Sequence, residues 1–208
     1  LVSSGAVALG KSIKSLQNFD VKDTAIKYDK KILKEQILAA AGQPKLMAFY
    51  ISEFEKYGLP CAQILATRAV FADRQAYLSL RTVTENLLQL KVVPIFNEND
   101  VLSPEELDFS DNDQLAGMVA AMLVADKLIL LSNVDGVYDS NPRDNPDAVL
   151  YRELSYSALI TILLKEKTKP RQNLVLDVPA ALILKRSKIT GLFLNGSKLQ
   201  NFESAVRG

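Results

Sequence analysis

The sequence predicts an α/β fold in which helices cover a largely parallel sheet. Two short apolar runs, residues 92–96 and 127–131, lack alternation between polar and apolar side chains, which is typical of strands buried on both faces. Segments with helical periodicity separate these runs from each other and from a third apolar run, residues 62–66. Because strands that alternate with helices form parallel sheets, we expect an α/β sandwich in one domain spanning residues 1–208.

The N-terminal part of the chain contains one turn, two long helical segments and one strand. Residues 3–5, with the sequence SSG, separate the end of a strand from a helix. Small residues let the backbone approach a ligand, and the N-terminus of a helix favours an anion. Residues 32–57 have apolar side chains at helical spacing, and the sequence GQP at residues 42–44 predicts a break there. The strand at residues 62–66 precedes a second helix at residues 74–90.

The C-terminal part continues the alternation of helices and strands. Asp111 can cap a helix, with Gln114 three residues later as in a capping box. The strand at residues 127–131 then leads into turns. We expect three further elements, a helix around residues 157–164, a helix that ends near residues 182–188 and a last strand at residues 192–194.

Composition restricts the chemistry that this chain can perform. Histidine is absent, which argues against a hydrolase triad and a zinc enzyme. Lys and Arg number 25 against 24 Asp and Glu, so we expect no binding to nucleic acid. Phosphoryl transfer suits the remaining residue types, because it depends on positioning and on neutralising charge with lysines, backbone N–H groups and Mg²⁺.

The sequence also suggests where the protein works. Cys61 is the only cysteine, and its apolar neighbours favour a small buried hydrophobic residue over a nucleophile. No apolar stretch approaches the roughly 20 residues of a membrane span, and the N-terminus lacks the pattern of a secretory signal. We therefore expect a cytoplasmic protein without a membrane partner.

Polar side chains follow two of the predicted strands at the point where each strand ends. Residues 97–100 are Asn-Glu-Asn-Asp, residues 110–113 are Ser-Asp-Asn-Asp, and Ser132 and Asn133 follow the later strand. Each cluster alone is explained equally well by a solvated loop or a helix cap. Ligands of α/β sheets bind outside the carboxyl ends of the strands, so together the clusters indicate one site. Amides and carboxylates suit a zwitterionic amino acid, and the carboxylates could also hold Mg²⁺.

Six motifs in these regions resemble those of the glutamate 5-kinases of the amino acid kinase family. They are LVSSGAVALGK, AAAGQPKLMAFY, AQILATR followed by DRQAY, VVPIFNEND, SDNDQLAG and ADKLILLSNVDGVYDSNPR. The motifs stand in the family's order and cover roughly residues 1–155, with a weaker similarity in ITGLFLNGS. The resemblance implies a three-layer α/β/α sandwich with a largely parallel central sheet, ATP and Mg²⁺ as cofactors, and L-glutamate as substrate.

The resemblance also implies roles for individual residues. Ser4, Asp100 and Asn112 match glutamate-binding positions, with Asp113 beside them, and no residue is assigned to a metal. Two further residues, Ser132 and Asn133, match positions that contact ATP, although family members commonly have Asp in place of Asn133.

Three features of the family are not found in this sequence. They are the first strand with its Lys-x-Gly motif, the glycine-rich GGMxTK loop, and the RNA-binding-like PUA domain that some members carry. The catalytic lysines are therefore not identified. Lys167 and Lys169 are candidates by location only, and a solvated basic segment explains them equally well.

The resemblance implies phosphorylation of the γ-carboxylate of L-glutamate to L-glutamyl 5-phosphate, the first step of proline biosynthesis. It also implies a homo-oligomer and feedback inhibition by proline. A degenerate homologue that binds glutamate or proline as a regulatory subunit is the alternative, since the lysine motifs are not found. A related kinase for another carboxylate, carbamate or phosphate is a third hypothesis, which the NEND and SDND motifs disfavour.

Overall fold

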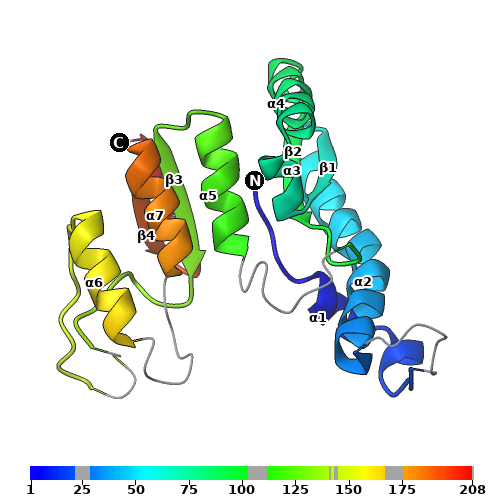
Figure 1. The fold of residues 1–208 in the computed structure, drawn as a ribbon, viewed down its shortest axis with the longest axis horizontal. Coiled ribbons are helices and arrows are strands. Elements are labelled where there is room, and N and C mark those ends of the chain that lie inside the picture. Colours follow the sequence, from blue (N-terminus) through cyan, green and yellow to red (C-terminus); the bar gives the residue numbers. More distant parts are fainter. Residues whose placement is uncertain (22–28, 103–111, 141, 143–144, 167–175, 208) are drawn as a thin grey trace. The chain divides into compact units, whose positions relative to one another are not determined.

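The computed structural model describes residues 1–21, 29–102, 112–140, 142, 145–166 and 176–207 (Figure 1). The chain divides into two compact units, Leu1–Leu115 and Ala116–Gly208. Each unit contains two parallel strands together with helices, which confirms the predicted α/β class. The expectation of one amino acid kinase domain over the whole chain stays a prediction.

The first unit is built around a pair of parallel strands. Strand β1 pairs with β2 from Cys61 opposite Val93 to Ala66 opposite Glu98. Val2 forms a parallel bridge with Phe96 on the other side of β2, so the N-terminal residues run alongside that strand. The elements of this unit are α1 (Ala6–Lys11), η1 (Lys14–Leu16), α2 (Lys30–Glu55), β1 (Cys61–Ala66), α3 (Arg68–Ala72), α4 (Arg74–Gln89), β2 (Val93–Glu98) and the start of α5 (Asn112–Met122).

Helices α1 and α2 approach each other more closely than side chains would allow (Figure 1). A Cβ atom on Gly42 of α2 would overlap the carbonyl oxygen of Ala6 and lie 2.7 Å from the backbone nitrogen of Gly10. A Cβ atom on Gly10 would overlap the carbonyl oxygen of Leu38 in the same way. Glycine is therefore required on both helices, and this contact fixes α1 against α2.

The predicted break at residues 42–44 is wrong, because α2 continues through Pro44. Proline in a helix interior removes one backbone hydrogen bond and typically costs about 3 kcal/mol. Leu38, Gly42 and Leu46 are nevertheless buried on one side of the helix. Packing of this side, including the contact with α1, outweighs the local preference for a break.

The second unit contains the parallel pair β3 (Lys127–Ser132) and β4 (Thr190–Asn195), in which Ser132 lies opposite Asn195. The core of this unit packs around Leu130, Leu184 and Ile189 with side chains of the flanking helices. Those helices are α6 (Tyr156–Glu166), α7 (Val178–Ser187) and α8 (Leu199–Arg207), together with the end of α5.

The predicted strands and long helices are confirmed, with differences at their ends. The short helix α3 and the C-terminal helix α8 were not predicted. The predicted cap residue Asp111 lies outside the described residues, whereas Gln114 is buried in the first turn of α5. Within the described ranges, the helices are too short or too polar to cross a bilayer.

Candidate functional site

A cavity of about 400 Å³ lies in the first unit, beyond the carboxyl end of β2. Three segments line it, the turn into α1, the residues that end and follow β2, and the first residue of α5. The lining residues are Ser4, Gly5, Ala6, Val7, Ala8, Lys11, Asn97, Glu98, Asp100 and Asn112.

Hydrogen bonds to β2 and α2 hold the N-terminal turn in place. The backbone N–H of Ser3 donates to the carbonyl oxygen of Phe96 at 2.9 Å, which aligns the turn with the end of β2. The hydroxyl groups of Ser3 and Tyr50 share a hydrogen bond of 2.8 Å. Gly5 then turns the chain into α1 with φ 107°, a left-handed value that favours glycine. This turn places Ser4 and the start of α1 on the cavity.

Asn97 offers the cavity a hydrogen-bond donor that has no partner. Its Oδ1 atom accepts the backbone N–H of Glu98 at 2.8 Å, which fixes the orientation of the carboxamide. Asn97 is only 4% exposed, and its Nδ2 atom is buried. This atom has no hydrogen-bond partner among the described residues. Because a buried donor without a partner is costly, a ligand that accepts this hydrogen bond is expected.

Asn112 provides the matching acceptor. Its Oδ1 atom is buried and, within the part of the chain that the structure describes, receives no hydrogen bond. Asn97 and Asn112 both line the same cavity. Among its described lining residues, the cavity therefore has one buried donor and one buried acceptor without a protein partner.

Asp100 adds a carboxylate whose ionisation is disfavoured. Burial raises the pKa of the Asp100 carboxyl above its ordinary value of 3.8, a hydrogen bond from its own backbone opposes this, and the negative charge of Glu35 raises the pKa further. Glu35 lies on α2 next to Gln36, whose side chain donates to the carbonyl oxygen of Val101 at 3.3 Å. A cation that binds beside Asp100 would relieve this cost.

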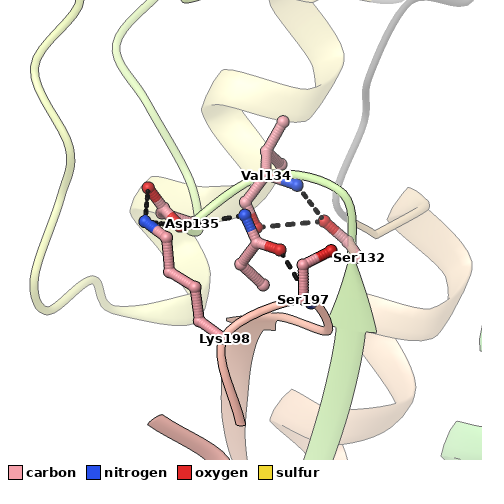
Figure 2. Close-up of polar contacts among 6 residues, drawn as sticks. Ser132, Val134, Asp135, Ser197 and Lys198 are labelled. Carbon is pink, nitrogen blue, oxygen red and sulfur yellow. Dashed lines mark hydrogen bonds and ion pairs between the residues drawn. The ribbon is translucent and has the colours of Figure 1, made fainter. Parts of the chain in front are cut away.

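In the second unit, Ser132 at the end of β3 forms hydrogen bonds with the backbone of Val134, as Figure 2 shows. The Ser132 hydroxyl accepts the backbone N–H of Val134 at 3.0 Å and donates to the carbonyl oxygen of the same residue at 3.3 Å. Asn133 is exposed. Ser132 therefore ends β3, and Asn133 is the first residue of the turn that follows.

Asp135 ties this turn to the segment after β4. Lys198 Nζ lies 2.7 Å and 2.8 Å from the two carboxylate oxygens of Asp135 (Figure 2). Asn195 Nδ2 also donates to Asp135 at 3.1 Å. These hydrogen bonds lower the pKa of the Asp135 carboxyl, the largest effect coming from Lys198. The pair keeps the turns after the two parallel strands together.

A larger cavity of about 1100 Å³ in the second unit extends along β4. Asp135 and Gly136 contribute to its lining, whereas Ser132 and Asn133 are not among its described lining residues. Lys167 and Lys169 lie outside the residues that the structure describes.

The described residues contain no cluster of three or more carboxylate, cysteine or histidine side chains that could enclose a metal ion. Mg²⁺ in phosphoryl-transfer enzymes is usually held by one or two carboxylates and by the phosphates themselves.

Comparison with known proteins assigns the chain to a family. The pattern of the amino acid kinase family matches residues 1–195, which is nearly the whole chain. The chain belongs to the amino acid kinase family. The resemblance inferred from the sequence motifs is thereby confirmed.

Its curated relatives in this family include several glutamate 5-kinases. The one from Chlorobaculum tepidum is 47% identical over 147 residues, which cover 70% of this chain and 38% of the relative. The one from Thermus thermophilus is 44% identical over 148 residues, covering 71% of this chain and 38% of the relative. The chain thus spans about two fifths of the length of the curated relatives that it matches.

Two solved structures of the amino acid kinase fold are similar to this chain. A uridylate kinase from Archaeoglobus fulgidus has a TM-score of 0.61 and 25% identity, and the match covers all of this chain and 79% of that one. An isopentenyl phosphate kinase, solved as a substrate complex, has a TM-score of 0.56 at 17% identity, covering 86% of this chain and 69% of that one. The second similarity concerns the fold alone.

The residues that the family resemblance suggested fall into two groups. Ser4, Asp100 and Asn112 line one cavity in the first unit. Asp113 lies next to Asn112 in the first turn of α5 but is not among the lining residues. The binding roles of all four residues, and of Ser132 and Asn133, stay predictions.

The sequence indicated Asn97 and Glu98 as members of the polar run at residues 97–100, without assigning either an individual role, and both line the cavity. Lys11 also lines the cavity and was not singled out. Lys11 carries no such signal, because it ends a helix whose packing brings it to the cavity.

Proposed function

We propose that this chain is the amino-acid-binding and nucleotide-binding part of a glutamate 5-kinase. The reaction would join a γ-carboxylate oxygen of L-glutamate to the γ-phosphorus of ATP and release ADP, giving L-glutamyl 5-phosphate. The observation that carries the proposal is the pair of buried groups without partners on one cavity, the donor of Asn97 and the acceptor of Asn112. The names of the curated relatives support the same substrate.

The cavity suits an α-amino acid because its polar groups match both ends of a zwitterion. A carboxylate needs donors, which Asn97 Nδ2 supplies, and an ammonium needs acceptors, which Asn112 Oδ1 and Asp100 supply. The ammonium would also stabilise the ionised form of Asp100 that burial disfavours. Positioning of the reactants, together with electrostatic stabilisation, is nearly all that a protein contributes to phosphoryl transfer, and holding the amino acid in one orientation is part of that positioning.

ATP and Mg²⁺ are the proposed cofactors. Ser132 at the end of β3 and Asn133 directly after it are the proposed nucleotide contacts. When bound, Mg²⁺ would neutralise charge on the phosphates during transfer. We further propose a cytoplasmic enzyme of proline biosynthesis that forms homo-oligomers and is inhibited by proline, as the resemblance implies.

The proposal is tested by titrating the purified protein calorimetrically with L-glutamate, L-aspartate, N-acetyl-L-glutamate and UMP. We expect saturable heat with L-glutamate and at least about tenfold weaker binding of the other three compounds. ADP release is then measured with Mg·ATP in the presence and absence of L-glutamate. Glutamate-dependent ADP release supports the kinase. Binding of L-glutamate without any binding of ATP would instead support the regulatory homologue, and preference for another compound would support a related kinase.

Asn97→Asp is expected to weaken L-glutamate binding by tenfold or more, which corresponds to a loss of about 1.4 kcal/mol or more in binding free energy. The substitution replaces the donor that would bind the ligand's carboxylate with an acceptor, so this hydrogen bond is lost. The substitution keeps the oxygen that accepts the Glu98 N–H and replaces only the Nδ2 donor. The new carboxyl group, once ionised, would repel the ligand's carboxylate, so the loss should be larger at pH 8 than at pH 5. Calorimetric titration at both pH values measures it. Equal affinity of variant and wild type at pH 8 would exclude Asn97 as a ligand contact.

A further inference from the structure

Lys11 is the only cation among the described residues that line the cavity. It is the last residue of α1, and its side chain is exposed. Elsewhere in the described part of the chain, no hydrogen-bond or ion-pair partner engages its ammonium group. By contrast, the nearby Lys45 donates to Ser12 at 3.2 Å. Lys11 therefore brings an unpaired positive charge to the cavity.

Without this lysine, the charged lining residues would all be carboxylates. The other charged lining residues are Glu98 and Asp100, so the lining carries one positive and two negative formal charges. L-glutamate carries a net negative charge at neutral pH, whereas L-glutamine is neutral overall. Removing Lys11 would leave an anionic ligand facing a lining whose described charged residues are both carboxylates. The lysine thus favours an acid over its amide on electrostatic grounds.

Burial distinguishes the two ends of the cavity. Asn97 is almost completely buried, whereas Lys11 is exposed. The carboxylate that is phosphorylated must be reached by a nucleotide, so it lies toward the open end. The α-carboxylate and α-ammonium then occupy the buried end, with Asn97, Asn112 and Asp100. This orientation places the side-chain carboxylate of the ligand beside Lys11.

We infer that Lys11 is a specificity-determining residue that pairs with the side-chain carboxylate of the amino acid and so selects the acid over the amide. This inference rests on the proposed function, because it assigns a role within the proposed glutamate site. The contact places the reacting carboxylate and offsets its charge.

The test compares the affinities of wild type, Lys11→Gln and Lys11→Arg for L-glutamate and L-glutamine by calorimetric titration. We expect wild type to prefer L-glutamate by about tenfold or more, as for one charge-assisted hydrogen bond. In Lys11→Gln, the affinity for L-glutamate should fall until the preference is less than about threefold, while the affinity for L-glutamine stays within about twofold. Lys11→Arg should retain most of the preference.

Lys14→Gln is the matched control, since it removes the same charge from a nearby residue that is not among those lining the cavity. It should leave the preference unchanged. If Lys11→Gln weakens both ligands equally, Lys11 contacts the shared α-carboxylate or supports the fold, and the inference is wrong. Unchanged affinities in Lys11→Gln overturn it as well. If wild type binds neither amino acid, the proposed function fails before this inference is reached.

Discussion

Gly42→Ala is expected to lower the free energy of unfolding by about 3 kcal/mol or more, at or beyond the upper end of typical overpacking costs. The added Cβ atom would overlap the carbonyl oxygen of Ala6, a backbone atom that cannot rotate away. Alanine is a better helix former than glycine by up to about 1 kcal/mol, which is too little to offset the overlap. Helix α1 would have to move away from α2.

Displacement of α1 should also disturb the cavity, because Ala6, Val7, Ala8 and Lys11 of α1 line it. We therefore expect Gly42→Ala to weaken L-glutamate binding as well as the fold. Urea unfolding followed by circular dichroism measures the stability, and calorimetric titration measures the affinity.

Gly117→Ala is the matched control for this substitution. Gly117 lies in α5, and the nearest atom to an added Cβ is Ile183 Cγ2 at 3.4 Å, an ordinary contact with a side chain. This variant should be as stable as wild type or more stable by up to about 1 kcal/mol, through helix propensity alone. Equal stability of Gly42→Ala and Gly117→Ala would contradict the close contact between α1 and α2.

Asp100→Asn is expected to stabilise the unliganded protein at neutral pH and to abolish most of its affinity for L-glutamate. Burial raises the pKa of Asp100 in the folded state, so the folded protein holds this proton more tightly than the unfolded chain does. The protonated carboxyl group of Asp100 therefore stabilises the fold fully when the pH is below 3.8, its ordinary pKa. This stabilisation is lost as the pH rises through the raised pKa of the folded state. At pH 7 the ionised carboxyl group therefore opposes folding, and asparagine removes this effect.

The same substitution removes the charged acceptor for the ammonium group of the ligand. Hydrogen bonds to charged groups contribute about 1.5–3 kcal/mol, so affinity should fall by about tenfold to 100-fold. Thermal unfolding at pH 7 and pH 3.5 and calorimetric titration at pH 7 measure the two effects. The gain in melting temperature should be present at pH 7 and small at pH 3.5.

Asp126→Asn provides the control, because it makes the same change of charge at an exposed carboxyl group. It should leave the affinity for L-glutamate unchanged and should not reproduce the gain in melting temperature at pH 7. A lower melting temperature for Asp100→Asn at pH 7 would show that Asp100 supports the fold, and the proposed conflict between stability and binding would be wrong.

Much of the fold could be predicted from the sequence, because the burial of each strand and helix determines the pattern of its apolar residues. The run at residues 92–96 lacks polar alternation, and strand β2 is buried in the structure. A strand surrounded by other elements has no polar face, so its sequence shows no alternation. The polar run begins where the apolar run ends, so its residues could be assigned to the end of the strand. This assignment predicted that Asp100 and Asn112 belong to one site, and both residues line the same cavity.

Other features could not be predicted because they depend on contacts between distant segments. Pro44 favours a break by itself, and only the packing of α2, including its contact with α1, explains why the helix continues. Lys11 resembles any basic residue at the end of a helix, and only the position of α1 brings it to the cavity. The residues next to Pro44 and Lys11 in the sequence do not indicate the packing of α2 against α1 or the position of Lys11 on the cavity.

The sequence by itself determined the α/β class, the order of the principal strands and helices, and membership of the amino acid kinase family, because each depends on local periodicity or on motifs read in order. The tertiary structure alone decided which polar groups are left without partners. The amide of Asn97 is oriented by the neighbouring N–H of Glu98, and burial then isolates its Nδ2 donor. Hydrogen bonding and burial belong to positions in space, so a polar run such as NEND indicates a site, whereas the fold selects the atoms available to a ligand.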